Sequence, residues 1–121
     1  TGCIALGKAA LEGYQDDGSL IYETDPEKNH TDMERHWWPQ AEAIVGLLNL
    51  AEMTGNPRYG ELAVQCWNYI KNNLIDCKQG EWFWSIYPNG EPNLTGDKAG
   101  FWKCPYHNSR ACLETMRRLE K

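Results

Sequence analysis

The feature that most constrains the fold is a helical spacing of apolar residues on both sides of Gly55. The set before this glycine comprises Ala41, Ile44, Val45, Leu48 and Ala51. The set after it comprises Tyr59, Leu62, Ala63, Cys66 and Ile70. Residues three and four apart share one face of an α-helix, so each set predicts a helix with one apolar side.

The ends of both helices carry residues that favour helix termini. Pro39 suits a first helical turn, because its φ is already fixed and its missing N–H is not needed there. Gly55 favours a helix end, and Asn56 before Pro57 is typical of a cap followed by a first turn. We therefore predict two antiparallel helices joined by a tight turn, the second of which ends near Leu74.

Shorter elements are predicted before and after this pair. Residues 3–11 are typical of the end of a helix that Gly13 stops. Residues 20–23 favour a short extended segment, and the polar residues 24–32 predict a surface loop. Residues 81–87 alternate in polarity ahead of a turn-forming sequence, which predicts a short hairpin or an extended loop.

A last helix is predicted from about Asn108 onward. Its apolar residues fall along one side: Cys112, Leu113, Met116 and Leu119. Arg117 and Arg118 lie in its last turns, where positive charge is favoured by the helix dipole. The elements together predict an all-α chain with one short hairpin or extended loop.

Length and charge exclude several classes of protein. At 121 residues the chain forms one small domain at most. Its formal net charge is −5 without a basic block, so the sequence does not predict binding to nucleic acid or to an anionic membrane. No apolar run is long enough to cross a bilayer.

The five cysteines form no CxxC pair, and their odd number argues against a full set of disulfides. We expect reduced, buried thiols in a cytoplasmic protein, since no secretory signal is evident. A zinc site made by Cys104, His107 and Cys112 would lack a fourth ligand at the usual spacing, so we expect no metal.

Three segments carry residue types that suit chemistry on a sugar, and they hold five of the six tryptophans. Residues 36–43 place two tryptophans and Glu42 at the start of a predicted helix, where the dipole would keep a first-turn carboxylate ionised. Residues 80–84 hold two more tryptophans. Residues 97–110 place His107 just before the last helix, and histidine is well suited to exchange protons near neutral pH. The structural alternatives are a capping acid beside core tryptophans, an apolar hairpin and a hydrogen-bonded structural imidazole.

In this order the three segments resemble the C-terminal signature of cellobiose 2-epimerases, within the N-acylglucosamine 2-epimerase superfamily. The signature is Trp-Trp-Pro-Gln-Ala-Glu, then Gly-Glu-Trp-Phe-Trp, then Asp-Lys-Ala-Gly-x-Trp-Lys-Cys-Pro-Tyr-His-Asn-x-Arg. The resemblance covers residues 16–119 and implies that residues 1–121 are the C-terminal part of one (α/α)6-barrel domain, without its N-terminal part. The family interconverts glucose and mannose at the reducing end of β-1,4-linked disaccharides through a cis-enediolate, without a metal or organic cofactor.

The resemblance also implies roles for residues that match the motifs. His107 matches one of two catalytic histidines, and Glu42 matches an active-site carboxylate that supports the acid–base groups. Trp38 and Trp102 match aromatic residues of the cleft, where indoles stack on sugar rings. Arg110 is expected among the substrate-binding residues, and it lies three residues after His107, within reach of it on the same helix face.

Other parts of the family site have no counterpart in this chain. The second histidine lies in a His-Asp-Ile-Glu type segment, and an arginine that polarises the carbonyl oxygen is also an N-terminal feature. His30 and His36 do not match that histidine and are expected to be exposed loop residues. We therefore expect the chain alone to be inactive. Its expected partners are a disaccharide, the N-terminal remainder of the barrel and, through exposed apolar helix faces, further copies of itself.

Three alternatives remain. The chain would also suit a relative that acts as an N-acylglucosamine 2-epimerase or a mannose isomerase. A glycoside hydrolase on a similar helical toroid would need two carboxylates, for which Glu42 and Glu81 are candidates. The tryptophans would also serve a sugar-binding module without catalysis.

Overall fold

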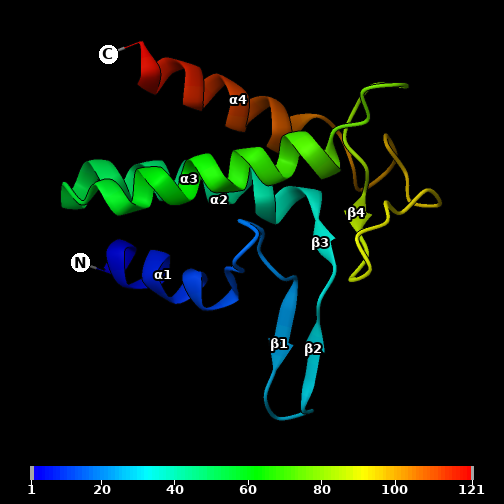
Figure 1. Cartoon of the computed structure of the whole chain (residues 1–121), viewed down its shortest axis with the longest axis horizontal. Helices are drawn as coiled ribbons and strands as arrows, with labels where there is room; N and C mark the ends of the chain where they lie inside the picture. Colours follow the sequence, from blue (N-terminus) through cyan, green and yellow to red (C-terminus); the bar gives the residue numbers. More distant parts are fainter. Residues whose placement is uncertain (1, 121) are drawn as a thin grey trace.

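The computed structural model describes residues 2–120 (Figure 1). Its helices are α1 (Gly2–Ala10), α2 (Trp37–Thr54), α3 (Pro57–Tyr69) and α4 (Tyr106–Leu119). A 3₁₀ turn (Leu11–Gly13) follows α1, and a π-helical turn (Ile70–Leu74) extends α3. The strands are β1 (Glu23–Asp25), β2 (His30–Asp32), β3 (Arg35–His36) and β4 (Ser85–Ile86). The predicted helical class is confirmed, and no helix within residues 2–120 is both long and apolar enough to cross a membrane.

Helices α2 and α3 form the antiparallel pair that the sequence predicts. Gly55 ends α2 at φ 68°, a left-handed conformation that suits glycine because it has no Cβ. Asn56 caps α3 by accepting a hydrogen bond from the N–H of Arg58 at 3.0 Å. Helix α2 begins at Trp37, two residues before Pro39. Proline is tolerated at this position because the first four N–H groups of a helix have no partner within it. This earlier start corrects the prediction for Glu42, which lies in the second turn.

Helix α2 is the centre of the fold and contacts α1, α3 and α4 (Figure 1). The buried core is formed mainly by α2, α3 and the segment after α3: Trp37, Ala41, Ile44, Val45, Leu47, Ala63, Cys66, Tyr69, Ile70, Leu74, Trp82, Ile86 and Ala111. Burial raises the pKa of the Cys66 thiol to about 12, so this thiol stays protonated at neutral pH. The other four cysteines are exposed, which corrects the prediction of buried thiols: Cys3, Cys77, Cys104 and Cys112.

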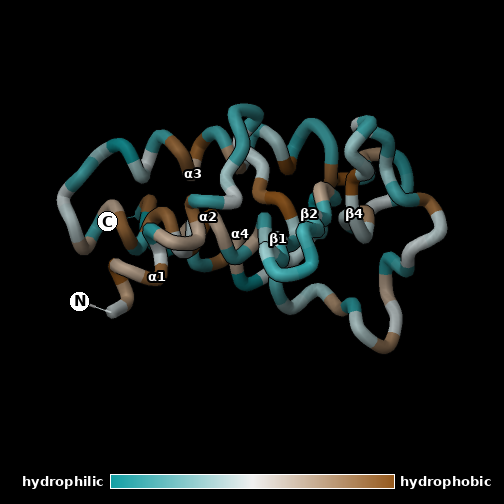
Figure 2. Tube along the Cα trace, turned by 90° about the horizontal axis from the view of Figure 1, so that it is seen from below, coloured by the Kyte–Doolittle hydropathy of each residue, from teal (hydrophilic) through white to brown (hydrophobic). Residues whose placement is uncertain are grey.

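A polar hairpin replaces the loop predicted for residues 24–32. Strands β1 and β2 pair antiparallel, with Glu23 opposite Asp32 and Asp25 opposite His30. The Asp25 carboxylate accepts the N–H groups of Glu27 and Lys28 and so stabilises the turn. The prediction was wrong because nearly all residues of the hairpin are polar, as the mostly hydrophilic colouring of β1 and β2 in Figure 2 shows. The alternation that marks a half-buried strand is therefore missing.

The second small sheet joins two segments that are far apart in the sequence. Strand β3 pairs antiparallel with β4, with Arg35 opposite Ile86 and His36 opposite Ser85. The predicted turn after residue 87 is present, because the N–H of Tyr87 donates to the carbonyl of Glu91 at 2.8 Å. The sheet holds the start of α2 against the tryptophan-rich segment that precedes β4.

Gly18 allows a close approach between the N-terminal loop and α3, and we expect Gly18→Ala to be strongly destabilising. Gly18 has φ 89°, and an added Cβ would lie 2.6 Å from the backbone oxygen of Gln65. The strained conformation and the clash should together lower the free energy of unfolding by about 2 kcal/mol or more. Urea denaturation would measure the loss. Gly60→Ala is the control, because a Cβ on Gly60 would meet nothing within 4 Å; an equal effect of both variants would contradict the prediction.

Candidate active site

Glu42 links helices α2 and α4 by accepting from two side chains of α4. Its Oε1 lies 2.8 Å from Nδ1 of His107, and its Oε2 pairs with Nη2 of Arg110. His107 and Arg110 are three residues apart on α4, so both face α2, and Ala111 is buried in the same contact. The structure thus brings together three of the predicted site residues, on two packed helices.

The contact with Glu42 determines which nitrogen of His107 is available for chemistry. A carboxylate accepts hydrogen bonds, so we assign the proton to Nδ1, which donates to Glu42. Nε2 then carries the free lone pair and is the nitrogen that can take a proton from a substrate. The side chain of His107 is one-third exposed, so solvent or a small molecule can reach it.

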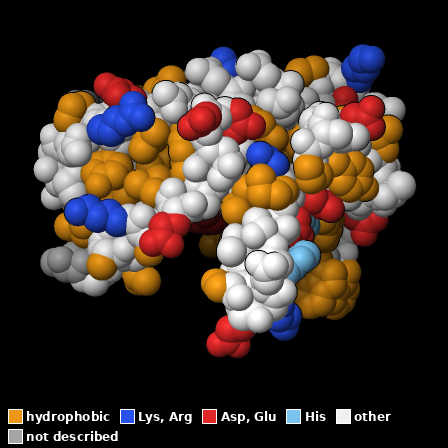
Figure 3. Space-filling model, turned by 60° about the horizontal axis from the view of Figure 1, so that its bottom comes forward, with side chains coloured by type: hydrophobic (Ala, Val, Ile, Leu, Met, Phe, Trp, Pro, Cys, Tyr) orange, Lys and Arg blue, Asp and Glu red, His pale blue; other side chains and the backbone are white. Residues whose placement is uncertain are grey.

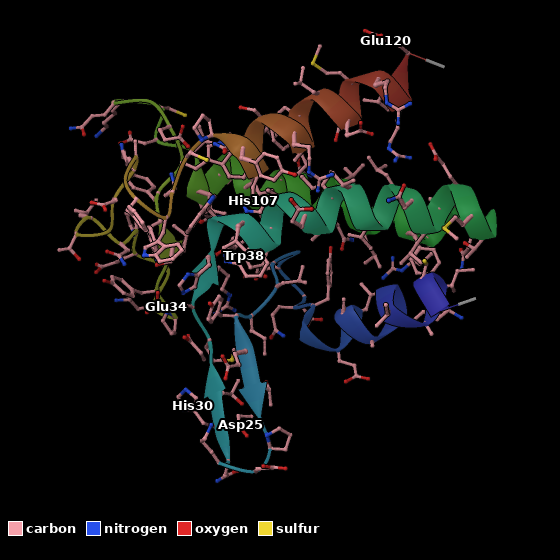
Figure 4. The ribbon with its side chains drawn as sticks, turned by 180° about the vertical axis from the view of Figure 1, so that it is seen from behind. Asp25, His30, Glu34, Trp38, His107 and Glu120 are labelled. Carbon is pink, nitrogen blue, oxygen red and sulfur yellow. The ribbon has the colours of Figure 1, made fainter. Side chains whose placement is uncertain are left out.

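Aromatic rings surround His107 on several sides. The ring of Trp38 lies 6.0 Å from the imidazole, that of Tyr106 at 5.1 Å and that of Trp37 at 6.5 Å, measured between centroids. Trp37 is buried in the core, whereas Trp38 is 39% exposed and offers a ring face beside His107. Figure 4 shows Trp38 and His107 close together where α2 and α4 approach each other.

A mostly apolar pocket of about 250 Å³ lies between α1 and the side of α2 that runs from Trp38 to Leu50. Trp38 and Glu42 both line it, and Glu42 is its one charged lining residue. Leu11 and Leu47 form part of the apolar wall. The carboxylate and the exposed indole of the site therefore border a cavity that is mainly hydrophobic.

Trp102 is the predicted site residue that the structure does not bring to the others. Its side chain is 80% exposed, and its described ring contact is with Phe101, at 5.0 Å between centroids. The segment that carries it lacks regular structure, so the helical contacts that place His107 do not place Trp102.

The two remaining histidines lie on strands and not on loops. His30 is exposed on β2, at the far end of the polar hairpin (Figure 4). His36 corrects the prediction of an exposed residue: its ring stacks on Tyr22 at 4.0 Å, and burial lowers its pKa. The Tyr22 contact could not be predicted, since it depends on the unpredicted path of residues 20–25.

A buried cluster of polar side chains beside the site could not be predicted from the motifs taken one at a time. The ammonium of Lys103 is completely buried and pairs with Oε1 of Glu81 at 3.2 Å. The same oxygen accepts Nδ2 of Asn108, the neighbour of His107, at 2.6 Å. The pKa of Glu81 is lower than usual. Burial alone would raise this pKa, but the backbone N–H of Trp82 and the side chains of Lys103 and Asn108 stabilise the carboxylate more strongly. All three residues of this cluster lie in the motif segments, and this shared location was the one sequence feature that pointed to them.

These contacts also bear on the zinc and hydrolase alternatives. Residues 2–120 contain no group of three or more histidine, cysteine or acidic side chains placed to hold a metal ion. Cys104 and Cys112 are exposed, and Nδ1 of His107 is directed at Glu42. Glu81 is held by a lysine and an amide of the protein itself, which does not suit one of the two acids of a hydrolase.

Comparison with known proteins gives a consistent result. The chain matches the N-acylglucosamine 2-epimerase (GlcNAc 2-epimerase) family over residues 7–111. It is 46% identical over 111 residues to a cellobiose 2-epimerase of Bacteroides fragilis, covering 92% of this chain and 28% of that protein. The structure of cellobiose 2-epimerase from Bacillus thermoamylovorans superposes with a TM-score of 0.88 at 38% identity, covering 95% of this chain and 29% of that one. The one from Spirochaeta thermophila gives 0.84 at 44% identity, covering 97% and 29%. The chain thus spans less than a third of the length of these relatives.

Proposed function

This chain belongs to the N-acylglucosamine 2-epimerase family, and we propose that it is the C-terminal part of an (α/α)6-barrel enzyme that epimerises carbon 2 of a sugar. The proposed substrate is the reducing-end glucose or mannose of a β-1,4-linked disaccharide. The observation that carries the proposal is the pairing of Glu42 with His107 and Arg110 beside the exposed ring of Trp38. The five free thiols support a cytoplasmic location, where thiols stay reduced.

His107 is the proposed base on one face of the sugar. Carbon 2 is acidic when the ring is open and carbon 1 is an aldehyde. Nε2 takes the carbon 2 proton, and the C–H electron pair forms the C1–C2 double bond while the carbonyl oxygen gains the charge of a cis-enediolate. A proton then returns to the opposite face after rotation of part of the intermediate. This step needs a second acid–base group, which donates the proton on that face and takes it in the reverse reaction. We place this group in the part of the barrel that lies outside this chain.

Glu42 and Arg110 support this base without touching the reacting carbon. The carboxylate fixes the ring of His107 through Nδ1 and stabilises the imidazolium that forms when Nε2 takes the proton. Arg110 pairs with the other oxygen of Glu42, so it affects His107 through the position of that carboxylate. We therefore assign Arg110 to positioning His107. The alternative role is a direct contact with substrate, since its side chain is 34% exposed.

The tryptophans are proposed to bind the sugar rings. The apolar C–H face of a pyranose packs well on an indole, and Trp38 offers an exposed face 6.0 Å from the ring of His107. We assign Trp102 to the same cleft on the basis of its motif position. Its exposed segment would then be placed by the remainder of the barrel or by the substrate.

The experiment that tests the proposal uses the full-length protein in heavy water. Cellobiose, mannobiose and N-acetylglucosamine are incubated separately, and deuterium at carbon 2 is followed by NMR. We expect deuterium at carbon 2 of the reducing-end sugar of cellobiose and mannobiose, with the linkage unchanged. Turnover of N-acetylglucosamine alone would favour the N-acyl alternative, ketose formation a mannose isomerase, and release of free glucose a hydrolase. Absence of any reaction would overturn the proposal.

The isolated chain should associate through its exposed apolar side chains. Figure 3 shows hydrophobic side chains in several exposed groups on one face. The predicted apolar side of α4 is among the exposed positions: Leu113, Met116 and Leu119, with Leu119 77% exposed. Since the chain spans less than a third of its relatives, we propose that the remainder of the barrel covers these residues.

We therefore expect the isolated chain to sediment as concentration-dependent oligomers and to increase the fluorescence of a dye that binds apolar surfaces. Co-expression with the N-terminal remainder should give one stoichiometric complex with little dye binding. A monomer at high concentration without dye binding would contradict this prediction.

A further inference from the structure

We infer that Glu81, Lys103 and Asn108 form a positioning network that fixes the first turn of α4, and thereby the direction in which Nε2 of His107 points. The inference rests on the proposed function, since His107 must present Nε2 to a substrate. These three residues would act on the reaction through the position of His107. We call them the Glu81 network.

Glu81 has a backbone conformation that is costly for a residue with a side chain. Its φ is 62°, directly after Gly80 at φ 80°. A non-glycine residue in the left-handed region persists where surrounding contacts require it. The loop around it is closed by two backbone bonds, from the N–H of Asp76 to the carbonyl of Glu81 at 2.9 Å and from the N–H of Gly80 to the carbonyl of Asp76 at 2.8 Å. The conformation directs the Glu81 carboxylate at α4.

One oxygen of Glu81 accepts three hydrogen bonds from different parts of the chain. Oε1 accepts the N–H of Trp82 at 3.0 Å, Nζ of Lys103 at 3.2 Å and Nδ2 of Asn108 at 2.6 Å. The first donor belongs to the same loop, the second to the segment before α4 and the third to α4 itself. A single carboxylate oxygen thus joins three segments at one point.

Lys103 carries the positive charge that the Glu81 carboxylate neutralises. Its side chain is fully buried, and its ammonium also donates to the carbonyls of Trp82 at 2.8 Å and Lys98 at 2.9 Å. A buried ammonium needs an opposite charge, and Glu81 is the carboxylate that pairs with it. The ammonium lies 5.5 Å from the ring centroid of Trp37, the first residue of α2. The network therefore lies between the start of α2, which carries Trp38 and Glu42, and the start of α4.

The start of α4 needs such an anchor. The residue before it is Pro105, which gives no side-chain hydrogen bond to the first turn. Asn108 is buried in this turn next to His107, so holding its amide fixes the rotation of the turn about the helix axis. Glu42 holds the imidazole itself. Two independent anchors, one on the ring and one on the adjacent residue, then determine where Nε2 points.

The test compares Asn108→Ala with Asn73→Ala in the full-length protein. Asn73 also donates its amide to a protein group, the carbonyl of Tyr69 at 2.9 Å, but it lies on the π-helical turn away from His107. A small misplacement of a catalytic group costs up to about 100-fold in rate. We expect Asn108→Ala to lower kcat about 10- to 100-fold with KM within about twofold of wild type, and Asn73→Ala to change neither.

A second variant separates positioning from stability. Glu81→Gln keeps an acceptor oxygen for Asn108 but removes the charge that balances Lys103, so it should lower the melting temperature more than Asn108→Ala does and lower kcat less. A merely structural role would make the loss of kcat follow the loss of stability in both variants. That result, or equal kcat values for Asn108→Ala and Asn73→Ala, would overturn the inference.

A readout without turnover separates this inference from the proposed function. With ¹⁵N-labelled histidine, the wild-type protein should show one set of His107 ring signals with the proton on Nδ1. Asn108→Ala should broaden or double these signals, and Asn73→Ala should leave them unchanged. A wild-type protein that lacks epimerase activity but shows this response would refute the proposed function alone. Unchanged signals in Asn108→Ala would refute the positioning network alone.

Discussion

Replacing His107 with alanine in the full-length protein is expected to lower kcat for cellobiose by about 100- to 10,000-fold while leaving the fold intact. A positioned acid–base group contributes a factor of this size to a proton transfer. The side chain is one-third exposed and makes its described hydrogen bond to Glu42, so its loss opens no cavity in the buried core. The measurement is the initial rate of mannose-terminated product, with circular dichroism to check the helices.

Two observations make this expectation specific to His107. His30→Ala is the matched control, because His30 is exposed on the β1–β2 hairpin and should be replaceable without loss of rate. In heavy water, His107→Ala should also slow the exchange of deuterium into carbon 2, because the proton transfer itself is affected. Wild-type exchange in this variant would remove His107 from the mechanism.

The helical part of the fold could be predicted from the sequence because its signals are local. Gly55, Asn56 and Pro57 act within one turn of chain, and the spacing of apolar residues predicts which face of α2 is buried. The π-helical turn that ends at Leu74 could not be predicted, since its hydrogen-bond pattern differs by one residue and leaves the apolar spacing almost unchanged.

Contacts between distant segments account for most of what the sequence did not predict. Strand β3 pairs with β4 across some fifty residues, so the pattern around residues 81–87 indicated an extended segment but not its partner. The burial of Lys103 opposes the general preference of lysine for the surface. It becomes understandable once Glu81 and two carbonyl groups are found around its ammonium.

The structure brings Glu42, His107 and Arg110 together as their motifs suggested, but the contacts that join them could not be predicted. The motifs indicated His107, Glu42 and Arg110, and the spacing of three residues placed two of them on one face of α4. The spacing did not predict that the Glu42 carboxylate lies between Arg110 and His107 and accepts from both. That arrangement depends on how α2 packs against α4, which no local pattern specifies.

Replacing Glu42 with glutamine should lower kcat by about 1,000-fold or more, although the side chain keeps its size. The amide can turn its NH₂ group toward Nδ1 of His107, which then becomes the acceptor and leaves the ring proton on Nε2. The nitrogen that faces the substrate would lose its free lone pair, and an amide in place of the carboxylate beside a catalytic histidine costs about 10,000-fold in a serine protease. Histidine ¹⁵N NMR should show the exchange of the Nδ1–H tautomer for the Nε2–H tautomer.

The chain provides a close control for this substitution. Glu52 is a second carboxylate of α2 that pairs with an arginine of α4, Arg118. Glu52→Gln therefore weakens the same helix–helix contact about three turns away from His107, without reaching the imidazole. If Glu42 acts through the tautomer of His107, Glu42→Gln loses activity and changes the ring signals, whereas Glu52→Gln does neither. Equal losses in the two variants would mean that the α2–α4 ion pairs support packing alone.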